Sequence, residues 1–90
     1  MIEGLKENVN LRVLSINQNN LKVIENLEGI YLSKLYLKQN QIKSITGLDN
    51  LPVLMTLDLS KNQIVKLKGL EQIESLRFLN LSLNRIYKVI

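Results

Sequence analysis

The sequence predicts a solenoid of the α/β class, with short parallel strands on its concave side and 3₁₀ or short helical turns on its convex side. The motif Leu-x-x-Leu-x-Leu-x-x-Asn-x-Ile begins at Leu54, and the same spacing begins at Leu11, Leu32 and Leu76. Self-similarity at a short fixed period indicates units that stack and bury one continuous core. The asparagines of the motif recur at intervals of 21, 22 and 22 residues: Asn19, Asn40, Asn62 and Asn84.

Each unit has two halves with different periods. In the first half, apolar residues alternate with outward-facing ones, as at Leu57 and Leu59, which predicts a short strand with one buried face. In the second half they recur every third position, as at Ile42, Ile45 and Leu48, which fits a tight 3₁₀ turn better than an α-helix. Strands of successive units are expected to lie side by side and parallel, about 4.8 Å apart.

The 90 residues are expected to form one repeat domain. It comprises a half-repeat at 2–10, repeats at 11–31, 32–53 and 54–75, and a partial repeat at 76–90. A solenoid of this size buries its core between stacked units and so avoids the small core of an ordinary domain of this length. The last layer has no further repeat to cover it in this sequence: Leu76, Leu79, Leu81, Ile86 and Val89.

The composition excludes several chemistries. The chain contains no Cys and no His, so thiolate zinc sites, disulfides and the commonest catalytic bases and nucleophiles are missing. Of the eight carboxylates only Asp58 is expected on the concave face, so no two-carboxylate catalytic site and no cluster of metal-binding oxygens is predicted. We therefore predict a protein that is not an enzyme and has no metal or cofactor.

The expected location is cytoplasmic. No apolar run approaches the roughly 18 residues of a membrane-spanning helix. The opening residues 1–4 do not begin a signal peptide. A nuclear location and a cytoskeletal or ciliary location remain alternatives.

The recurring asparagines are expected to be structural. A buried Asn at the turn after each strand can bond backbone groups of its own repeat and of the next, and so satisfy amides that the sheet leaves unpaired. Recurrence in every layer favours this role over ligand binding. Gly47 and Gly69 likewise indicate tight turns, because no phosphate-binding motif surrounds them.

The 22-residue unit continues after its asparagine with Ile-x-x-Ile/Leu-x-Gly-Leu, at 42–48 and at 64–70. It resembles the short leucine-rich repeats typified by a regulatory subunit of protein phosphatase 1. Axonemal dynein light chains and a spliceosomal protein have similar repeats. The resemblance covers nearly all of residues 2–90 and implies a protein-interaction module, in the role of a regulatory or scaffolding subunit.

The candidate binding site follows from the repeat register. Side chains that flank the buried pair of each strand point away from the core and form columns over the stack. Basic residues and aromatics gather there, so we predict that this face binds an acidic or amphipathic segment of a partner protein. Lysines would steer the encounter and aromatics would anchor the segment. The predicted partner-binding residues are Arg12, Lys34, Tyr36, Lys38, Asp58, Lys61, Phe78 and Asn80.

Three other interpretations stay open. A polar, lysine-bearing surface is also what any exposed face requires. Basic residues interleaved with Tyr36 and Phe78 could meet the phosphates and stack the bases of single-stranded nucleic acid, although the net charge of +4 is mild for that role. Finally, the last strand, around Phe78–Ser82, presents an unpaired edge through which chains could associate end to end.

Overall fold

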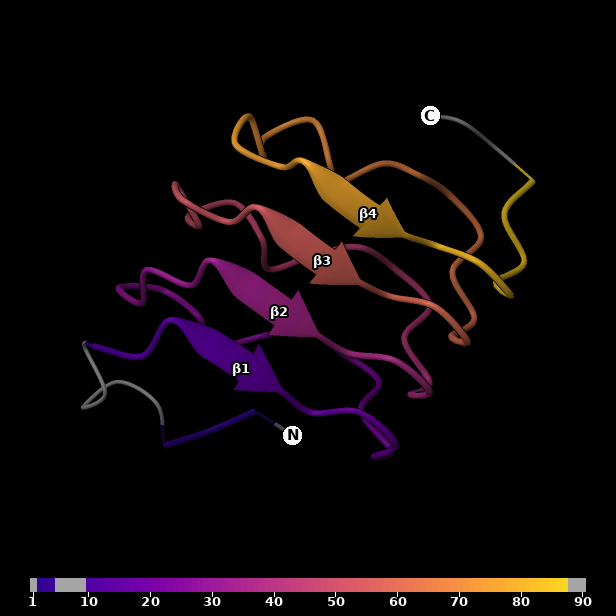
Figure 1. Ribbon diagram of the computed structural model, residues 1–90. Coiled ribbons are helices and arrows are strands. Elements are labelled where there is room, and N and C mark those ends of the chain that lie inside the picture. Colours follow the sequence, from indigo (N-terminus) through magenta and orange to yellow (C-terminus); the bar gives the residue numbers. More distant parts are fainter. Residues whose placement is uncertain (1, 5–9, 88–90) are drawn as a thin grey trace.

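The computed structural model describes residues 2–4 and 10–87 of the chain, and these form a single parallel sheet (Figure 1). Its strands are β1 (Val13–Ser15), β2 (Lys34–Tyr36), β3 (Thr56–Asp58) and β4 (Phe78–Asn80). They lie in the order β1-β2-β3-β4, and each pairs in parallel with the next. The predicted parallel sheet, with one strand from each unit, is therefore confirmed.

The register of the sheet is the register of the repeat. Leu14, Leu35, Leu57 and Leu79 are Cα partners across the four strands. Backbone bonds continue the pairing beyond the strand ends, as from the Leu37 N–H to the Asp58 carbonyl at 2.8 Å. A residue in the left-handed conformation, with φ near +60°, then turns the chain away from the sheet in every unit: Gln18, Gln39, Lys61 and Leu83.

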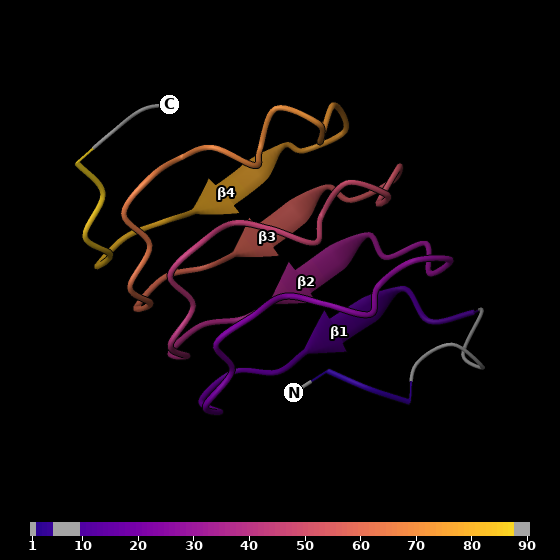
Figure 2. The ribbon, with the colours of Figure 1, turned by 180° about the vertical axis from the view of Figure 1, so that it is seen from behind.

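The return segments cross behind the strands (Figure 2) and contain no helix within the described residues. The prediction of 3₁₀ or short helical turns, and with it the α/β class, is therefore wrong. The bonds of 3₁₀ spacing stand alone, as from the Ile30 N–H to the Leu27 carbonyl at 3.4 Å and from Leu54 to Leu51 at 3.3 Å. An apolar period of three is shared by 3₁₀ helix and by extended backbone with three residues per turn, so the period did not distinguish them.

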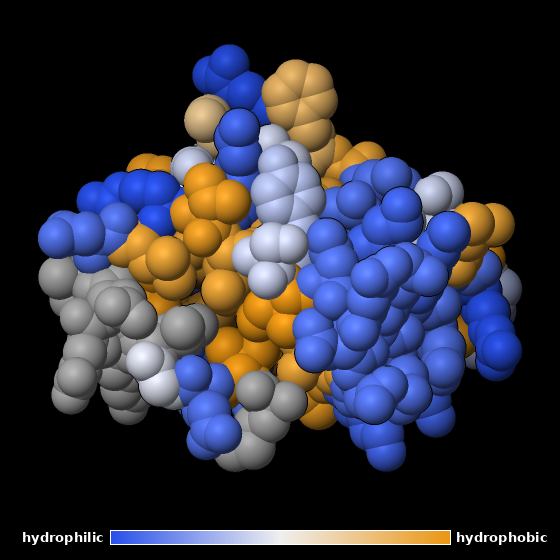
Figure 3. Space-filling view, turned by 60° about the horizontal axis from the view of Figure 1, so that its bottom comes forward, coloured by the Kyte–Doolittle hydropathy of each residue, from blue (hydrophilic) through white to orange (hydrophobic). Residues whose placement is uncertain are grey.

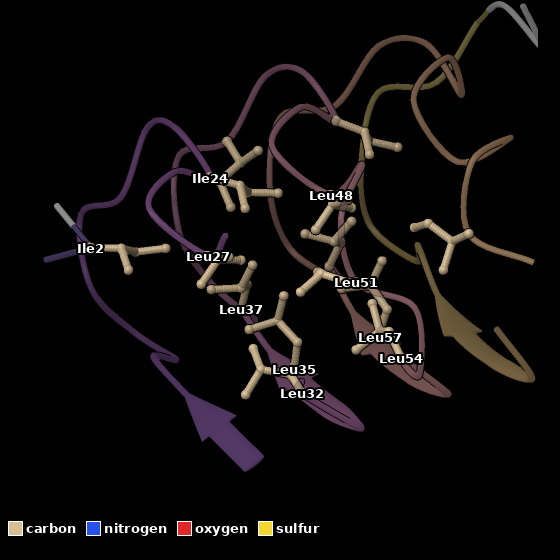
Figure 4. Packing of buried hydrophobic residues seen from close by; sticks show 14 of the residues in the cluster. Ile2, Ile24, Leu27, Leu32, Leu35, Leu37, Leu48, Leu51, Leu54 and Leu57 are labelled. Atoms are coloured by element: carbon tan, nitrogen blue, oxygen red, sulfur yellow. The ribbon is translucent and has the colours of Figure 1, made fainter. Parts of the chain in front are cut away.

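The core lies between the sheet and the return segments. Leucines of the strands meet Ile24, Leu48 and other side chains of the return segments (Figure 4). The inner layers are closed, and Leu57 is only 1% exposed. Its counterpart Leu79 in the last strand is 42% exposed, because no described segment packs over that layer. Residues 5–9 of the half-repeat and Val89 of the last layer lie outside the described residues.

Two glycines mark points where neighbouring layers touch. Gly47 has φ +74° and Gly69 φ +114°, so both occupy turns that disfavour other residues. A Cβ at Gly47 would lie 2.2 Å from the carbonyl oxygen of Ile24, so the layers also approach closely there. In the first repeat Asn26 holds the equivalent place with φ +62°, and its side chain donates to the Ile2 carbonyl at 2.6 Å.

The predicted asparagine ladder is confirmed for three of its four members. The Nδ2 of Asn62 donates to the Leu37 carbonyl at 2.9 Å and to the Leu59 carbonyl at 3.0 Å. Its Oδ1 accepts from the Ile42 N–H at 3.1 Å. Asn40 and Asn84 make the equivalent bonds.

Two features of that ladder differ from prediction. Asn40, Asn62 and Asn84 bond their own repeat and the preceding one, whereas the following repeat was expected. Asn19 is exposed, and its Nδ2 donates to the Asn17 carbonyl of its own turn at 2.9 Å. The reason is that, within the described residues, no strand precedes β1 to offer backbone groups.

Candidate functional site

The outward side chains of the strands form one exposed surface, which we call the open face. The return segments lie behind the sheet, so no described segment crosses this surface (Figures 1 and 2). The register arranges its side chains in two rows that run across the strands. The open face consists of Val13, Ser15, Lys34, Tyr36, Thr56, Asp58, Phe78 and Asn80.

The first row combines apolar ends with a cation. Lys34 lies between Val13 and Thr56 in the register, and Phe78 lies beyond Thr56. Phe78 is 68% exposed and Val13 is 48% exposed. The row therefore offers two separate apolar contacts with an ammonium group between them.

The second row contains the one carboxylate of the open face. Asp58 and Tyr36 are partners in the register, and both are half-buried. The Oδ1 of Asp58 accepts from the N–H of Ser60 at 2.9 Å and from its hydroxyl at 2.7 Å. Asn80 accepts from the Ser82 N–H at 3.0 Å in the same way. Asp58 thus closes the turn after β3, a role that its predicted place in the binding site did not include.

The predicted basic residues differ in their exposure and in their position relative to the open face. Lys34 is exposed and Lys38 is half-buried, and neither makes an ion pair with another described residue. The Lys38 N–H donates to the Oδ1 of Asn17 at 2.7 Å, which fixes the backbone at the edge of the open face. Arg12 precedes β1, and its Nη1 donates to the Leu11 carbonyl at 3.2 Å. Lys61 lies in the turn after β3, so Arg12 and Lys61 border the open face.

A second basic surface follows the carboxyl ends of the strands, and we call it the basic flank. Segments 17–23, 38–44, 60–66 and 82–87 contain no Asp or Glu. Figure 3 shows hydrophilic side chains gathered over this side of the molecule, toward which the strands point. Sequence reasoning missed Lys22, Lys43 and Lys66, although their places in the repeat could have revealed them. The cations of the basic flank are Lys22, Lys38, Lys43, Lys61, Lys66 and Arg85.

The acids are on the other side of the repeat. Glu25, Glu28, Asp49 and Glu74 belong to the return segments that lead to the next strand. Glu71 lies there too, and hydrogen bonds from its own backbone N–H and from that of Gly69 lower the pKa of its carboxyl. The two kinds of charge are therefore segregated around the solenoid.

Four hollows in the described part of the chain lie away from the open face, since none of them has an open-face residue in its lining. These hollows are lined by residues of turns and return segments, such as Tyr31, Asn50 and Glu74. The described residues contain no group of three or more acidic side chains that could hold a metal ion. Within the same residues, no helix has the length and apolar character to cross a membrane.

Comparison with protein families agrees with this architecture. A family model described as leucine-rich repeat matches residues 30–86, which is more than half of the chain. The chain therefore belongs to the leucine-rich repeat family, whose domains generally serve as protein-interaction modules and are typically non-catalytic. A search of curated proteins finds no match to the chain.

Proposed function

We propose that the chain is a non-catalytic module that binds an acidic or amphipathic segment of a partner protein on its open face. The observation that carries the proposal is the exposed row of Val13, Lys34 and Phe78 on a sheet that no described segment covers. Lys34 and Lys38 attract carboxylates at long range, and Tyr36 and Phe78 supply area for apolar contacts. A flat face of this kind suits a polypeptide better than a small molecule, which binds in a pocket.

The narrower assignment is part of the same proposal. The repeat length and the glycines at 47 and 69 support the short subclass typified by a regulatory subunit of protein phosphatase 1. A regulatory or scaffolding role in the cytoplasm would follow from that subclass.

Photocrosslinking tests where the partner sits. A photoreactive amino acid replaces Tyr36 on the open face, and in a second protein it replaces Tyr31, which is 51% exposed in a return segment. We expect covalent partner adducts from the first position only, in lysate from the source cells. Adducts formed only from the second position would move the site to the return segments.

A pair of matched variants tests the contribution of the side chains. Lys34→Ala with Tyr36→Ala removes one cation and one aromatic ring from the open face. Lys68→Ala with Tyr31→Ala removes the same groups elsewhere. We expect the first pair to abolish capture of the crosslinked partner and the second pair to retain it. Equal capture by both pairs would contradict the proposal.

Self-association is the second candidate, because no described segment covers the last layer. The N–H groups of Leu37 and Leu59 bond carbonyls of the next strand, and within the described residues no strand follows β4 to accept from Leu81. With Leu79 exposed as well, this edge could pair with another chain. Light scattering across a concentration series tests it. A mass that rises with concentration supports association, and a constant monomer mass excludes it.

A further inference from the structure

The basic flank contains a hollow lined entirely by long polar side chains. Lys22, Gln41, Lys43 and Gln63 surround a volume of about 280 Å³. Lys22 and Lys43 hold the same position in adjacent repeats, and so do Gln41 and Gln63. The hollow therefore arises from the stacking of three layers and belongs to the folded repeat array.

The floor of the hollow is held in place by backbone bonds. The Gln41 N–H donates to the Leu21 carbonyl at 2.8 Å, and the Gln63 N–H donates to the Ile42 carbonyl at 2.9 Å. Both glutamines are half-buried, whereas Lys22 and Lys43 are exposed and make no ion pair with another described residue. Two amides on a fixed backbone are thus combined with two ammonium groups that have no carboxylate partner among those residues.

This combination of groups favours an anion. Each lysine supplies three N–H donors and no acceptor, and the Gln63 amide supplies two more. The Gln41 amide supplies one, because its Nε2 also donates to the Oδ1 of Asn20 at 3.5 Å. Charge-assisted bonds to a carboxylate are stronger than bonds between neutral groups. Two hollows of the return segments differ, because one is lined by Asp49 and Glu74 and the other by Glu25, Glu28 and Asp49. A third hollow, next to Lys43, combines three lysines with the carboxylate of Asp49.

The identity of the anion follows from what surrounds the hollow. None of its four lining residues is aromatic, so the bases of a single-stranded nucleic acid would find no ring to stack on there. Lys38 is half-buried between the open face and the turn that leads to Gln41, so cations continue from one surface to the other. A segment on the open face can therefore extend over the basic flank without leaving positive potential.

We propose that the hollow between Lys22, Gln41, Lys43 and Gln63 binds the carboxylate of a glutamate or aspartate in an acidic protein segment. This inference rests on the proposed function, since the segment is the one that the open face binds. The hollow adds a second contact region on the basic flank, and it specifies that the partner is acidic beyond the part that crosses the strands.

The side-chain amide signals of the glutamines report occupancy directly. Hexaglutamate is titrated into the ¹⁵N-labelled chain at low salt and followed by ¹H–¹⁵N correlation spectra. We expect the amide signals of Gln41 and Gln63 to shift saturably, while Gln72, on the return segment between β3 and β4, stays in place. Unchanged signals of Gln41 and Gln63 would overturn the inference.

Matched charge variants separate a site from a general effect of net charge. We expect Lys22→Gln with Lys43→Gln to weaken hexaglutamate binding roughly five- to tenfold, the range for losing two exposed ion pairs. Lys68→Gln with Arg77→Gln removes the same charge from exposed positions outside the basic flank and should change the affinity less than about twofold. Arginine at positions 22 and 43 should preserve binding. Equal losses in the two glutamine pairs would overturn the proposal.

Two further outcomes identify what has failed. If an oligothymidylate shifts the Gln41 and Gln63 signals at lower concentration than hexaglutamate, the hollow binds phosphate polymers and the proposal is wrong. If the backbone signals of Lys34 and Tyr36 respond to hexaglutamate while Gln41 and Gln63 do not, the open face stands as the site and the hollow is excluded. If only the glutamines respond, the hollow stands and the open-face proposal fails.

Discussion

The Nδ2 of Asn62 donates to the carbonyl oxygen of Leu37, 25 residues earlier in the chain, over 2.9 Å. The same amide group reaches the Leu59 and Ser60 carbonyls of its own layer. Asn62 is 6% exposed, so water cannot replace these bonds. One side chain therefore bonds backbone groups of two layers, and the Leu37 and Leu59 carbonyls among them have no backbone partner.

The first prediction follows from this bond. Asn62→Ala should lower the free energy of unfolding by about 2 kcal/mol, because it leaves the buried Ile42 N–H without its acceptor. The Leu37 and Leu59 carbonyls lose one donor each but keep the amides of Asn40 and Asn84. Asn19→Ala is the control, since Asn19 is exposed and should cost less than about 0.5 kcal/mol. Urea unfolding followed by circular dichroism measures both. Similar losses at the two positions would show that burial of the amide is not what matters.

The second prediction concerns close approach of layers. Gly47→Ala should cost on the order of 3 kcal/mol, because it combines a positive φ with overlap against the Ile24 carbonyl. Gly29 also has positive φ, at +79°, but a Cβ there meets no atom within 4 Å. Gly29→Ala should therefore cost only about 1 kcal/mol, the value for the backbone conformation alone. The unfolding midpoints of the two variants measure these costs. Equal destabilisation by Gly47→Ala and Gly29→Ala would exclude the layer contact at Gly47.

The third prediction compares one repeat position in two layers. Leu57→Ala should lower the free energy of unfolding by about 3 kcal/mol, because it opens a cavity in a closed layer. Leu79→Ala should cost about 1 kcal/mol, since that side chain is already 42% exposed. If the two variants unfold at the same urea concentration, the last layer is covered in solution, for instance by a second chain.

The sequence predicts the fold well wherever one rule acts on every layer. The strand leucines and the spacing of the asparagines determine the register, and the structure reproduces it pair by pair. The return segments were mispredicted because their apolar period fits two backbone conformations. Asn19 was mispredicted for a different reason: the other asparagines of the ladder bond a preceding strand, and the described residues contain no strand before β1.

The candidate site was predictable only in part. Alternation within the strands identified Tyr36 and Phe78 as outward-facing, since that follows from geometry alone. The turn-closing bond from the Ser60 N–H to the Asp58 carboxylate was missed, although Asp-x-Ser at the end of a strand is a known turn pattern. Lys22 and Lys43 were missed because the prediction considered the strands and their ends and did not compare later positions of the repeat. The hollow that they share depends on the distance between stacked layers, which the sequence pattern does not give.

The fourth prediction concerns pH. The lowered pKa of Glu71 means that its carboxylate stabilises the fold above the pKa of the unfolded chain and that this contribution is lost as the pH falls through the folded pKa. Glu71→Gln keeps an acceptor for the Gly69 N–H but removes the charge. The variant should be less stable than the parent at pH 7 and equal to it at pH 2. Urea midpoints at the two pH values measure this, and a pH-independent difference would contradict it.

The fifth prediction joins the fold to the proposed function. Asp58→Asn should leave the free energy of unfolding within about 0.5 kcal/mol of the parent, because an amide oxygen can accept from Ser60 as Asn80 accepts from Ser82. The change also removes the one acid of the open face, so hexaglutamate should bind roughly two- to fivefold more tightly.

Glu74→Gln is the matched control for that change. It makes the same difference in net charge from an exposed return segment, and the hollow that Glu74 lines contains neither Lys22 nor Lys43. Salt weakens its effect on hexaglutamate bound elsewhere, so the affinity should stay nearly unchanged. Titrations of both variants at 0.1 M salt distinguish local from overall charge. If Glu74→Gln strengthens binding as much as Asp58→Asn, the acidic probe responds to total charge and the result contradicts binding on the open face.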